Sequence, residues 1–385
     1  MPNAPAFQST VDPALAAQHR YDVLIVGAGP AGSSAAYHLA HRGADVLLVD
    51  RFAFPRDKRC GDGIITAALE ELALMGIAGA VQARYSESRQ VALWLYGTET
   101  ISACTATEHF GTNYVAPRLG FDALLCEHAL QAGASWLDQM TVHTLAEVQP
   151  RGVIAVGIHK GAPLRIQARI VIAADGSGSH LARQLRKSLL EQGITAPLTG
   201  PEVRMTRFTA MRGYYQNVER LKDADGAMEF YMHTEPGTYY YWIFPMHDGL
   251  ANVGVIAHMQ QLRTHHPDLA RALRAFLQSP AVNERTAAAA LQGQLGAAPI
   301  WSGMRGTALY GDHVLCVGDA AALVHPLTAE GISGALTSGR LAAETALSAL
   351  EQRDYSLQAL SPYGEAIRAR YEMLYDTLLQ NAPNL

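Results

Sequence analysis

The feature that most constrains the fold of this chain is the glycine run GAGPAG, which lies between a short apolar stretch and a helical one. The residues YDVLIVG, which end in the first glycine of the run, predict a buried parallel strand, and SSAAYHLAHRG predicts a helix that stops at a glycine. ADVLLVD then predicts a second strand that ends on Asp50. Glycines with this spacing, in a strand–turn–helix–strand context, are typical of dinucleotide-binding domains.

Each glycine of this run has a separate physical task. Gly27 permits the tight turn, Gly29 lets the backbone approach a pyrophosphate, and Gly32 lets the helix pack close to the strand. The N-terminus of the helix offers free N–H groups to phosphate oxygens. Asp50 lies 18 residues after Gly32 (50 − 32), where an acid can accept both ribose hydroxyls. The residues predicted to contact the cofactor here are Gly27, Gly29, Pro30, Ala31, Gly32, Asp50 and Arg51.

Two later stretches predict further contacts with the same ligand. ARIVIAADGSGS is an apolar strand that runs into Asp175 and Gly176, and HVLCVGDAAALV is one that runs into Gly318 and Asp319. A buried acid is costly unless it is satisfied, and ligands of open α/β sheets lie at the carboxyl ends of the strands. The ordered set of three motifs favours FAD over NAD, with Asp319 on a ribityl hydroxyl.

A long helix is predicted to begin at about Gly331, after the loop PLTAEGI. Its N-terminus would direct a positive dipole end at whatever lies beyond the ribityl chain. In a flavin this is the N1–C2=O edge, where reduction places negative charge, so the helix would stabilise the reduced ring. No second GxGxxG motif occurs, so a nicotinamide cofactor with its own Rossmann domain is not expected.

The composition argues against several other classes of protein. The net charge of the 385 residues is −5 without a block of like charges, so nucleic acid is not an expected partner. The four cysteines form no CxxC pair, which argues against zinc, iron–sulfur and disulfide frameworks. Residues 1–19 do not resemble a signal peptide, and no apolar run is long enough to cross a membrane. The expected location is the cytoplasm, with peripheral contact to the inner face of the membrane as the open alternative.

Residues 200–260 alternate in the manner of strands, with turn signals between them, and predict an antiparallel sheet. Three aromatic side chains of the run YYYWIFP share one face of a strand, namely Tyr240, Trp242 and Phe244. The other face carries Tyr239, Tyr241 and Ile243. Aromatic side chains on a sheet face more often pack in a core than bind a ligand, so the pattern alone favours a core.

The stretch FPRDKRCGDG, residues 54–63, follows the second predicted strand. Gly61 and Gly63 would let the backbone pass against a flat ring system that side chains would obstruct. The three cations of the stretch can face the pyrophosphate or a phosphate of the substrate. Cys60 has no partner cysteine nearby, so it is either a thiol beside the flavin or a structural residue.

With these motifs in place, the chain resembles the two-domain FAD oxidoreductases of the para-hydroxybenzoate hydroxylase type, and within them the geranylgeranyl reductase family. Four stretches carry the resemblance: VGAGPAGSSAAYHLA, FPRDKRCGDG, YYYWIFPMHDGLANVGV and GDAAALVHPLTAEGISGALTSGRLAAE. APRLGFDALLCEHA also matches the Arg-x-x-Phe-Asp-x-x-Leu pattern of the family, which puts Arg118 near the cofactor. The family loop usually reads Pro-Leu-Thr-Gly-Glu-Gly-Ile, and Ala329 stands here in place of its first glycine. The further cofactor contacts expected from the motifs and the resemblance are Arg59, Cys60, Gly61, Arg118, Asp175, Gly176, Gly318, Asp319, Pro326, Gly331 and Ile332.

The resemblance implies an α/β chain, α+β overall, in which a Rossmann-like FAD-binding domain carries an inserted antiparallel-sheet domain for the substrate. The expected boundaries are 20–85, 115–185 and 300–350 for the FAD-binding domain, 86–114 and 186–299 for the substrate domain, and 351–385 for a C-terminal helical segment. The residues implied to line a pocket for a long apolar chain are Tyr240, Trp242, Phe244 and Pro245. The last helix would pack on its own domain, cap the pocket or join a dimer.

The leading hypothesis is a reductase that acts on carbon–carbon double bonds of an isoprenoid-like chain by hydride transfer from reduced FAD. A nearby acid or water must protonate the second carbon, and the candidate side chains are Cys60, Asp62 and Tyr240. The reducing equivalents would come from transiently bound NAD(P)H, a ferredoxin-like carrier or a quinol. The alternatives are an FAD-dependent monooxygenase or oxidase of secondary metabolism, and a non-enzymatic FAD-bound partner protein. The exact substrate, the electron donor and the oligomeric state stay open.

Overall fold

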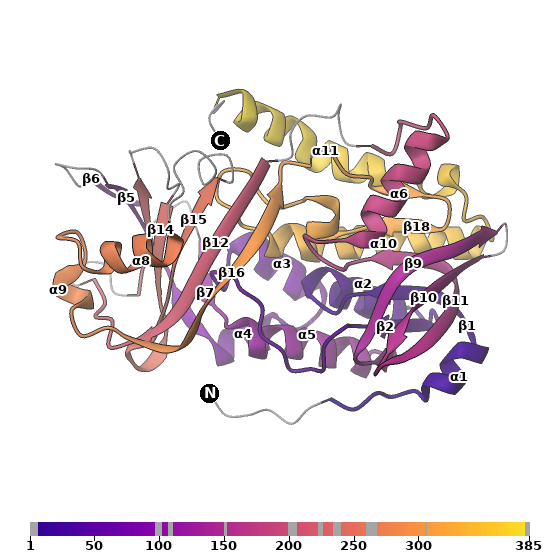
Figure 1. The fold of residues 1–385 in the computed structure, drawn as a ribbon, viewed down its shortest axis with the longest axis horizontal. Coiled ribbons are helices and arrows are strands. Elements are labelled where there is room, and N and C mark those ends of the chain that lie inside the picture. Colours follow the sequence, from indigo (N-terminus) through magenta and orange to yellow (C-terminus); the bar gives the residue numbers. More distant parts are fainter. Residues whose placement is uncertain are drawn as a thin grey trace. The chain divides into compact units, whose positions relative to one another are not determined.

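The computed structural model describes residues 7–96, 102–106, 111–149, 152–198, 206–221, 226–233, 240–258, 268–304 and 306–381. The chain divides into two compact units. Unit 1 consists of Met1–Arg56, Leu119–Thr206 and Trp301–Leu385, and unit 2 consists of Asp57–Arg118 and Arg207–Ile300. Figure 1 labels most of the helices and strands of both units.

Unit 1 is built on one mixed sheet. Its strands are β1 (Arg20–Val26), β2 (Val46–Val49), β8 (Ser135–Leu137), β9 (Met140–Gln149), β10 (Gly152–His159), β11 (Ala162–Ala173), β17 (Tyr310–Gly311) and β18 (Val314–Cys316). Its helices are α1 (Pro13–Gln18), α2 (Pro30–Ala40), α5 (Arg118–Gln131, from its second residue), α6 (His180–Glu191), α10 (Ile332–Gln352) and α11 (Leu357–Asn381), with the 3₁₀ turn η2 (Gly318–Ala321).

The centre of this sheet is parallel. The strand order is β17-β18-β11-β1-β2-β8, in which β18, β11, β1, β2 and β8 run parallel, while β10 and β9 continue antiparallel from β11. β1 is buried without interruption from Val23 to Val26, as expected for a parallel strand covered on both faces. The α/β class and the strand–turn–helix–strand order predicted from the glycine run are confirmed.

Small residues bring two long helices of unit 1 together. A Cβ atom at Gly339 of α10 would lie 2.3 Å from the backbone oxygen of Ala31 in α2, so only glycine permits this approach. The hydroxyl of Ser34 in α2 donates to the backbone oxygen of Leu336 in α10 at 2.8 Å. Figure 1 shows the two helices side by side. The contact fixes the start of α2, and so the glycine turn, against α10.

The C-terminal helix α11 packs on unit 1. The hydroxyl of Tyr363 donates to the backbone oxygen of Cys316 at 2.6 Å, and that of Tyr375 donates to the backbone oxygen of Leu323 at 2.9 Å. Of the roles considered for this helix, packing on its own unit is the one observed. No helix within the described ranges is both long and apolar enough to span a bilayer.

Unit 2 is built on a large sheet and a small one. Its strands are β3 (Gly63–Ile64), β4 (Ser86–Ser88), β5 (Val91–Tyr96), β6 (Ser102–Ala106), β7 (Asn113–Val115), β12 (Thr206–Gln216), β13 (Met228–His233), β14 (Tyr240–Pro245), β15 (Ala251–His258) and β16 (Ala290–Ser302). Its helices are α3 (Thr66–Leu74), α4 (Ala78–Arg84), α8 (Leu269–Leu277) and α9 (Asn283–Thr286), with the 3₁₀ turn η1 (His247–Gly249).

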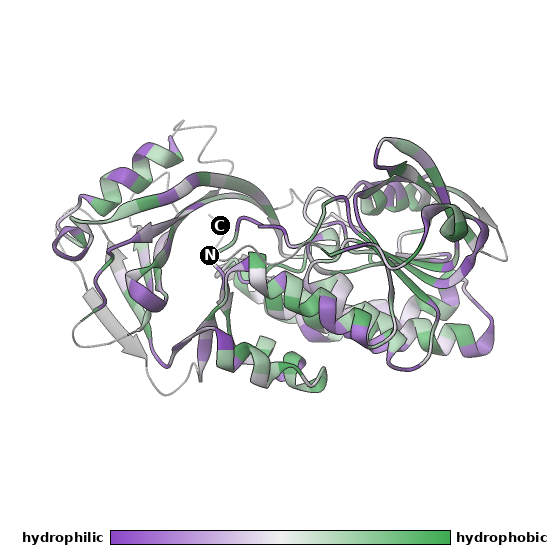
Figure 2. Ribbon diagram, turned by 90° about the horizontal axis from the view of Figure 1, so that it is seen from below, coloured by the Kyte–Doolittle hydropathy of each residue, from purple (hydrophilic) through white to green (hydrophobic). Residues whose placement is uncertain are grey.

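The large sheet has the order β16-β12-β15-β14-β13-β5-β6, and the small one the order β3-β7-β4. Neighbouring strands of the large sheet from β12 to β6 are antiparallel, except for the parallel pair β13 and β5, which the sequence did not predict. One face of the sheet is covered by α8, whose Phe276 stacks on Tyr241 with ring centroids 4.3 Å apart. Figure 2 shows such amphipathic helices as alternating purple and green bands.

Candidate functional site

Four motif segments of unit 1 meet at the carboxyl edge of its parallel sheet. In the strand register, Val26 pairs with Val49 on one side and with Ala173 on the other, and Ala173 pairs with Cys316. Each of these residues is followed at once, or after one further residue, by a predicted cofactor residue: Gly27, Asp50, Asp175 and Gly318. Ligands of such sheets lie at this edge. Segments spread over almost 300 positions of sequence are therefore brought to one place.

The glycine turn fits closely against its neighbours. Gly27 has φ +108°, and a Cβ atom there would lie 2.3 Å from the backbone oxygen of Ala174. A Cβ atom at Gly32 would lie 1.8 Å from the backbone oxygen of Gly27, so the helix can approach the strand only through glycine. Gly29 is the N-cap of α2 and Pro30 its first residue. Because Gly29 has no side chain to cap the helix, the first-turn N–H groups of α2 suit a phosphate.

Asp50 holds the glycine turn in place. It is buried, and its Oδ2 accepts a hydrogen bond from the backbone N–H of Ala28 at 2.9 Å. Its Oδ1 accepts one from the N–H of Phe52, also at 2.9 Å. A carboxylate has about four acceptor positions, so each oxygen keeps one for a ribose hydroxyl. Arg51, by contrast, is exposed, and its guanidinium lies 4.9 Å from the centre of the Phe52 ring.

Asp175 lies at the end of β11 with a carboxyl oxygen that suits a ligand. Its Oδ2 accepts from the N–H of His180 at 3.1 Å, and its Oδ1 is buried with no hydrogen-bond partner in the described part of the chain. Burial raises the pKa of this carboxyl. Gly176 follows with φ +82°, so the chain turns sharply after the acid. An acceptor left unsatisfied by the protein at this edge fits a hydroxyl-bearing cofactor.

The second Gly-Asp motif also turns tightly. Gly318 has φ +57°, and its N–H donates to the hydroxyl of Ser338 at 2.9 Å. Asp319 follows in η2, and a Cβ atom at Gly331 would lie 3.6 Å from its Oδ1. The long helix α10 begins at Ile332 with Gly331 as its N-cap, as predicted. Asp319 and the start of α10 are therefore neighbours.

The loop before α10 contains Ala329, which stands where the family loop usually has its first glycine. Ala329 has φ 53°, the left-handed region in which alanine is strained and glycine is not. Two residues before Ile332, the carboxylate of Glu330 accepts from the backbone N–H of Ser333 at 2.8 Å and from its hydroxyl at 2.5 Å. Burial raises the pKa of Glu330. The positive end of α10 thus already has one carboxyl group on it, a feature that the sequence did not indicate.

In unit 2, the loop Asp57–Gly63 lies along the large sheet. Both oxygens of Asp57 accept from Nη2 of Arg212, at 2.7 and 2.8 Å, and Arg212 is buried with its guanidinium 4.3 Å from the centre of the Tyr214 ring. The side chain of Arg59 lies across β16, because a Cβ atom at Gly296 would meet its Nε at 2.0 Å. These contacts anchor the loop to β12 and β16.

The loop ends in a buried acid. Asp62 is fully buried and has φ 66°, a left-handed conformation that aspartate tolerates. Its Oδ2 accepts from the hydroxyl of Tyr214 at 2.6 Å and from Nδ2 of Asn252 at 2.8 Å. Nδ2 of Asn252 also donates to the backbone oxygen of Cys60 at 2.8 Å, and its Oδ1 accepts from the indole N–H of Trp242 at 2.9 Å. Among the described residues, Oδ1 of Asp62 has no hydrogen-bond partner.

Burial makes Asp62 an acid that titrates near neutral pH. Desolvation raises its pKa to about 6, against the lowering effects of Arg212, of the hydrogen bonds from Tyr214 and Asn252, and of Arg118. A carboxyl group with such a pKa can hold a proton and also release it. Arg118, one of the predicted site residues, lies in unit 2 and is itself buried. Its positive charge lowers the pKa of Asp62.

The predicted aromatic wall is one face of β14. Tyr240, Trp242 and Phe244 follow one another along it, with ring centroids 6.0 and 6.3 Å apart, and Phe230 of β13 lies 5.0 Å from Phe244. All three β14 side chains are buried, and Pro245 ends the strand. A Cβ atom at Gly61 would lie 3.1 Å from the Phe244 ring. A side chain at Gly61 would therefore meet the aromatic face, and the contact of Gly61 with a flavin stays a prediction.

Cys60 is half-buried and is a free cysteine, as are Cys126 and Cys316. Its backbone oxygen, through Asn252, belongs to the network around Asp62. Tyr240 lies beside Trp242 on the aromatic face. The structure thus brings the three candidate proton donors into one unit. Sequence reasoning missed Tyr214 and Asn252; the polar Asn252 inside the apolar run LANVGVIAH was the signal that could have found it.

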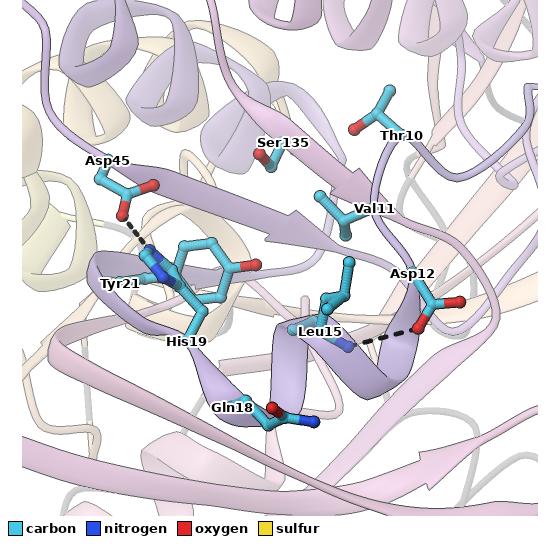
Figure 3. Close-up of a pocket in the computed structure, with 10 residues that line it drawn as sticks. Thr10, Val11, Asp12, Leu15, Gln18, His19, Tyr21, Asp45 and Ser135 are labelled. Carbon is cyan, nitrogen blue, oxygen red and sulfur yellow. Dashed lines mark hydrogen bonds and ion pairs between the residues drawn. The ribbon is translucent and has the colours of Figure 1, made fainter.

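A separate recess in unit 1 is not a part of this site. It has residues from α1 and from the amino ends of β1, β2 and β8 around it, among them Tyr21 and Ser135 (Figure 3). Nε2 of His19 and Oδ2 of Asp45 lie within hydrogen-bond distance in it, at 2.5 Å. Because it lies at the amino ends of the strands, it is at the wrong edge for the dinucleotide. No cluster of metal ligands occurs in the described part of the chain.

Comparison with known proteins gives matches along most of the chain. The sequence profile of the family described as FAD binding domain matches residues 20–368. Digeranylgeranylglycerophospholipid reductase 1 of Methanopyrus kandleri is 32% identical over 355 residues, which cover 89% of this chain and 84% of that protein. Menaquinone reductase of Mycobacterium tuberculosis is 31% identical over 353 residues, which cover 86% of this chain and 77% of that protein.

Solved structures agree with these matches. A geranylgeranyl bacteriochlorophyll reductase-like protein from Thermoplasma acidophilum is 26% identical with a TM-score of 0.77, covering 93% of this chain and 85% of that one. The myxobacterial chondrochloren halogenase has a TM-score of 0.76 at 22% identity, covering 94% of this chain and 82% of that one. At that identity the likeness to the halogenase concerns the fold alone.

Proposed function

This chain belongs to the geranylgeranyl reductase family of FAD-dependent oxidoreductases, and from this premise we propose that it reduces carbon–carbon double bonds of a long apolar, isoprenoid-like substrate. The two relatives named above are reductases of an isoprenoid lipid and of menaquinone, both of which carry long apolar chains. Unit 1 would bind FAD at the carboxyl edge of its sheet, and unit 2 would bind the substrate. The observation that carries the proposal is the buried Asp62 next to the aromatic face of β14, where burial raises its pKa to about 6.

The residues of unit 1 would hold FAD through complementary groups. The first turn of α2 offers N–H groups to the pyrophosphate, and Asp50 offers acceptor positions to the ribose. Asp175 has a buried oxygen with room for a hydroxyl hydrogen bond, and Asp319 is placed next to the start of α10. Bound FAD supplies a hydride once a two-electron donor, NAD(P)H or a reduced carrier, has reduced it.

The residues of unit 2 would supply the rest of the chemistry. Reducing an alkene consumes one hydride and one proton, and isolated alkenes accept hydride poorly unless an acid is well placed. In our proposal, the hydride goes to one alkene carbon while Asp62 gives its proton to the other, which leaves a saturated bond and an Asp62 carboxylate. The carboxylate is stabilised by Tyr214, Asn252 and the two buried arginines until solvent returns the proton. Tyr240, Trp242 and Phe244 would pack against the apolar chain.

Single-turnover kinetics under anaerobic conditions test this proposal. FAD in the enzyme is first reduced chemically, and its reoxidation by prenyl lipids or prenylquinones is then followed by absorbance. Chemical reduction of the flavin in Asp62→Asn should proceed as in the parent enzyme. Reoxidation of the reduced flavin by the substrate should be slower by about 10²- to 10⁴-fold, the usual contribution of a positioned acid. Cys60→Ala should change both steps less than twofold. The reverse pattern would assign the proton to Cys60.

The pH dependence gives a second check. Because Asp62 must be protonated to act, the rate of reoxidation by the substrate should fall as the pH rises through about 6. Oxygen uptake coupled to the conversion of the substrate would instead indicate a monooxygenase or oxidase. A flavin that no donor reduces would leave only an FAD-binding partner protein.

A further inference from the structure

The two oxygens of the Asp62 carboxyl group are not equivalent. Oδ2 accepts two hydrogen bonds, from the hydroxyl of Tyr214 and from Nδ2 of Asn252. Oδ1 is equally buried, yet it has no partner among the residues that the structure describes. A buried polar atom without a partner is costly, and such atoms in a folded protein often serve a function. The question is which oxygen carries the proton.

The orientation of Asn252 is fixed by groups that have only one possible role. The indole N–H of Trp242 can only donate, so the amide oxygen of Asn252 must face it, at 2.9 Å. The backbone oxygen of Cys60 can only accept, so the amide nitrogen must face it, at 2.8 Å. In a flipped amide, the NH₂ group of Asn252 would face the N–H of Trp242, donor against donor, and its oxygen would face the oxygen of Cys60, acceptor against acceptor. Asn252 can therefore only donate to Asp62.

Tyr214 adds a second donor on the same side. Burial and the nearby Asp62 raise the pKa of Tyr214, so its hydroxyl keeps its proton over the working pH range. The hydroxyl lies 2.6 Å from Oδ2 of Asp62. With two N–H or O–H hydrogens directed at Oδ2, a proton on that oxygen would lose one of these bonds. A proton on Oδ1 keeps both.

We propose that Asn252 and Tyr214 are positioning residues of the reaction, which confine the transferable proton of Asp62 to Oδ1. This inference rests on the proposed function, and it specifies how the acid of that function is oriented. The proton is then on the oxygen that has no hydrogen-bond partner among the described residues, so no bond within the described part of the protein has to break when it is transferred. When the proton leaves, Oδ2 is already solvated by both donors, so no rearrangement is needed to stabilise the carboxylate.

The charged groups around Asp62 agree with this assignment. Arg212, from β12, and Arg118, at the start of α5, both favour the ionised form. Asp57 is paired with Arg212 and moderates its effect. Both arginines therefore stabilise the product state of the proton transfer, whereas the burial of Asp62 preserves the protonated starting state.

Infrared difference spectroscopy of the FAD-containing enzyme tests the assignment without turnover. The carbonyl band of protonated Asp62 is identified by its absence in Asp62→Asn. If the proton is on Oδ1, the carbonyl oxygen is Oδ2, and Tyr214→Phe, which removes one of its donors, shifts the band to higher frequency. The pKa read from this band rises by about one pH unit, since a donor that stabilises the carboxylate is lost.

Tyr231→Phe is the matched control, because Tyr231 is another tyrosine of this sheet whose hydroxyl donates to a buried carboxylate, that of Glu229, at 2.5 Å. It should leave the Asp62 band and pKa unchanged. An Asp62 band that Tyr214→Phe does not move would put the carbonyl on Oδ1 and overturn the inference. Tyr214→Phe removes a single atom, so folding should be retained.

The rate profile separates this inference from the proposed function. If both hold, the pH limb of flavin reoxidation in Tyr214→Phe moves up with the pKa of Asp62, by the same one unit or so. In Tyr214→Phe, a shifted carbonyl band of Asp62 together with an unchanged pH dependence of flavin reoxidation would reject Asp62 as the acid. It would also reject the catalytic use of Asn252 and Tyr214.

Discussion

Replacing Asp62 by asparagine should change how the stability of the protein depends on pH. In the folded protein, burial raises the pKa of Asp62 from its ordinary 3.8 to about 6. A raised pKa means that the folded state binds the proton more tightly than the unfolded state. The contribution of Asp62 to stability is therefore fully present below pH 4 and is lost as the pH rises towards 6.

The size of this loss follows from the shift. A difference of about 2 pH units at 1.36 kcal/mol each gives about 3 kcal/mol between low pH and pH 7 or above. Asparagine resembles the protonated acid in shape and does not titrate, so Asp62→Asn escapes the loss. The free energy of unfolding of the variant, relative to the parent, should therefore increase by about 2 to 3 kcal/mol from pH 4 to pH 7.

Urea denaturation of both proteins at several pH values between 4 and 7.5 measures this difference. Asp248→Asn is the control, because Asp248 also has a left-handed backbone, with φ 58°, but is exposed to water. It should follow the parent at every pH. Parallel curves for the parent and Asp62→Asn would refute the reasoning, since they would show that Asp62 ionises as readily in the folded as in the unfolded chain.

Three further substitutions test the backbone geometry. Ala329→Gly should raise the free energy of unfolding by up to about 1 kcal/mol, since it relieves the left-handed alanine at φ 53°. The control is Ala369→Gly, at an exposed position of α11, which should lower the free energy of unfolding by about 1 kcal/mol. Gly254→Ala would put a Cβ atom 2.1 Å from the Trp242 ring, so it should lower the free energy of unfolding by about 1 to 3 kcal/mol and change the tryptophan fluorescence. An unchanged free energy of unfolding and an unchanged fluorescence would contradict the packing described. Gly27→Ala should weaken FAD binding at least about tenfold, because φ +108° does not suit alanine. Titration with FAD measures this, and the far-ultraviolet circular dichroism spectrum should be unaltered. Full FAD affinity would argue against the site at this turn.

The sequence predicted which segments meet at the carboxyl edge of the unit 1 sheet, because its signals are local. A glycine turn, and an acid at the end of an apolar strand, each predict a strand end, and parallel pairing then aligns these ends. Gly27, Asp50, Asp175 and Gly318 accordingly follow four neighbouring strands. The same reasoning flagged Ala329, and the structure shows the left-handed conformation that made the substitution notable.

The network around Asp62 could not be predicted in the same way. Tyr214 and Asn252 lie 152 and 190 positions away from Asp62 along the chain, and their contacts depend on strand register and on the path of the loop. A one-residue change in register would turn either side chain to the other face of the sheet. The sequence could name Asp62 as a candidate acid, but its raised pKa follows from burial, which is a property of the whole unit.

The bond between Asp50 and the backbone of Ala28 has a thermodynamic consequence for cofactor binding. A glycine-rich loop is costly to order, since each glycine loses more conformational freedom than any other residue. Here part of that entropy is lost during folding, when Oδ2 of Asp50 accepts the N–H of Ala28. In the proposed FAD site the loop would therefore meet the dinucleotide already shaped, and more of the interaction energy would remain as affinity. A cofactor that must stay bound through repeated cycles of reduction and oxidation benefits from a receptor organised in this way.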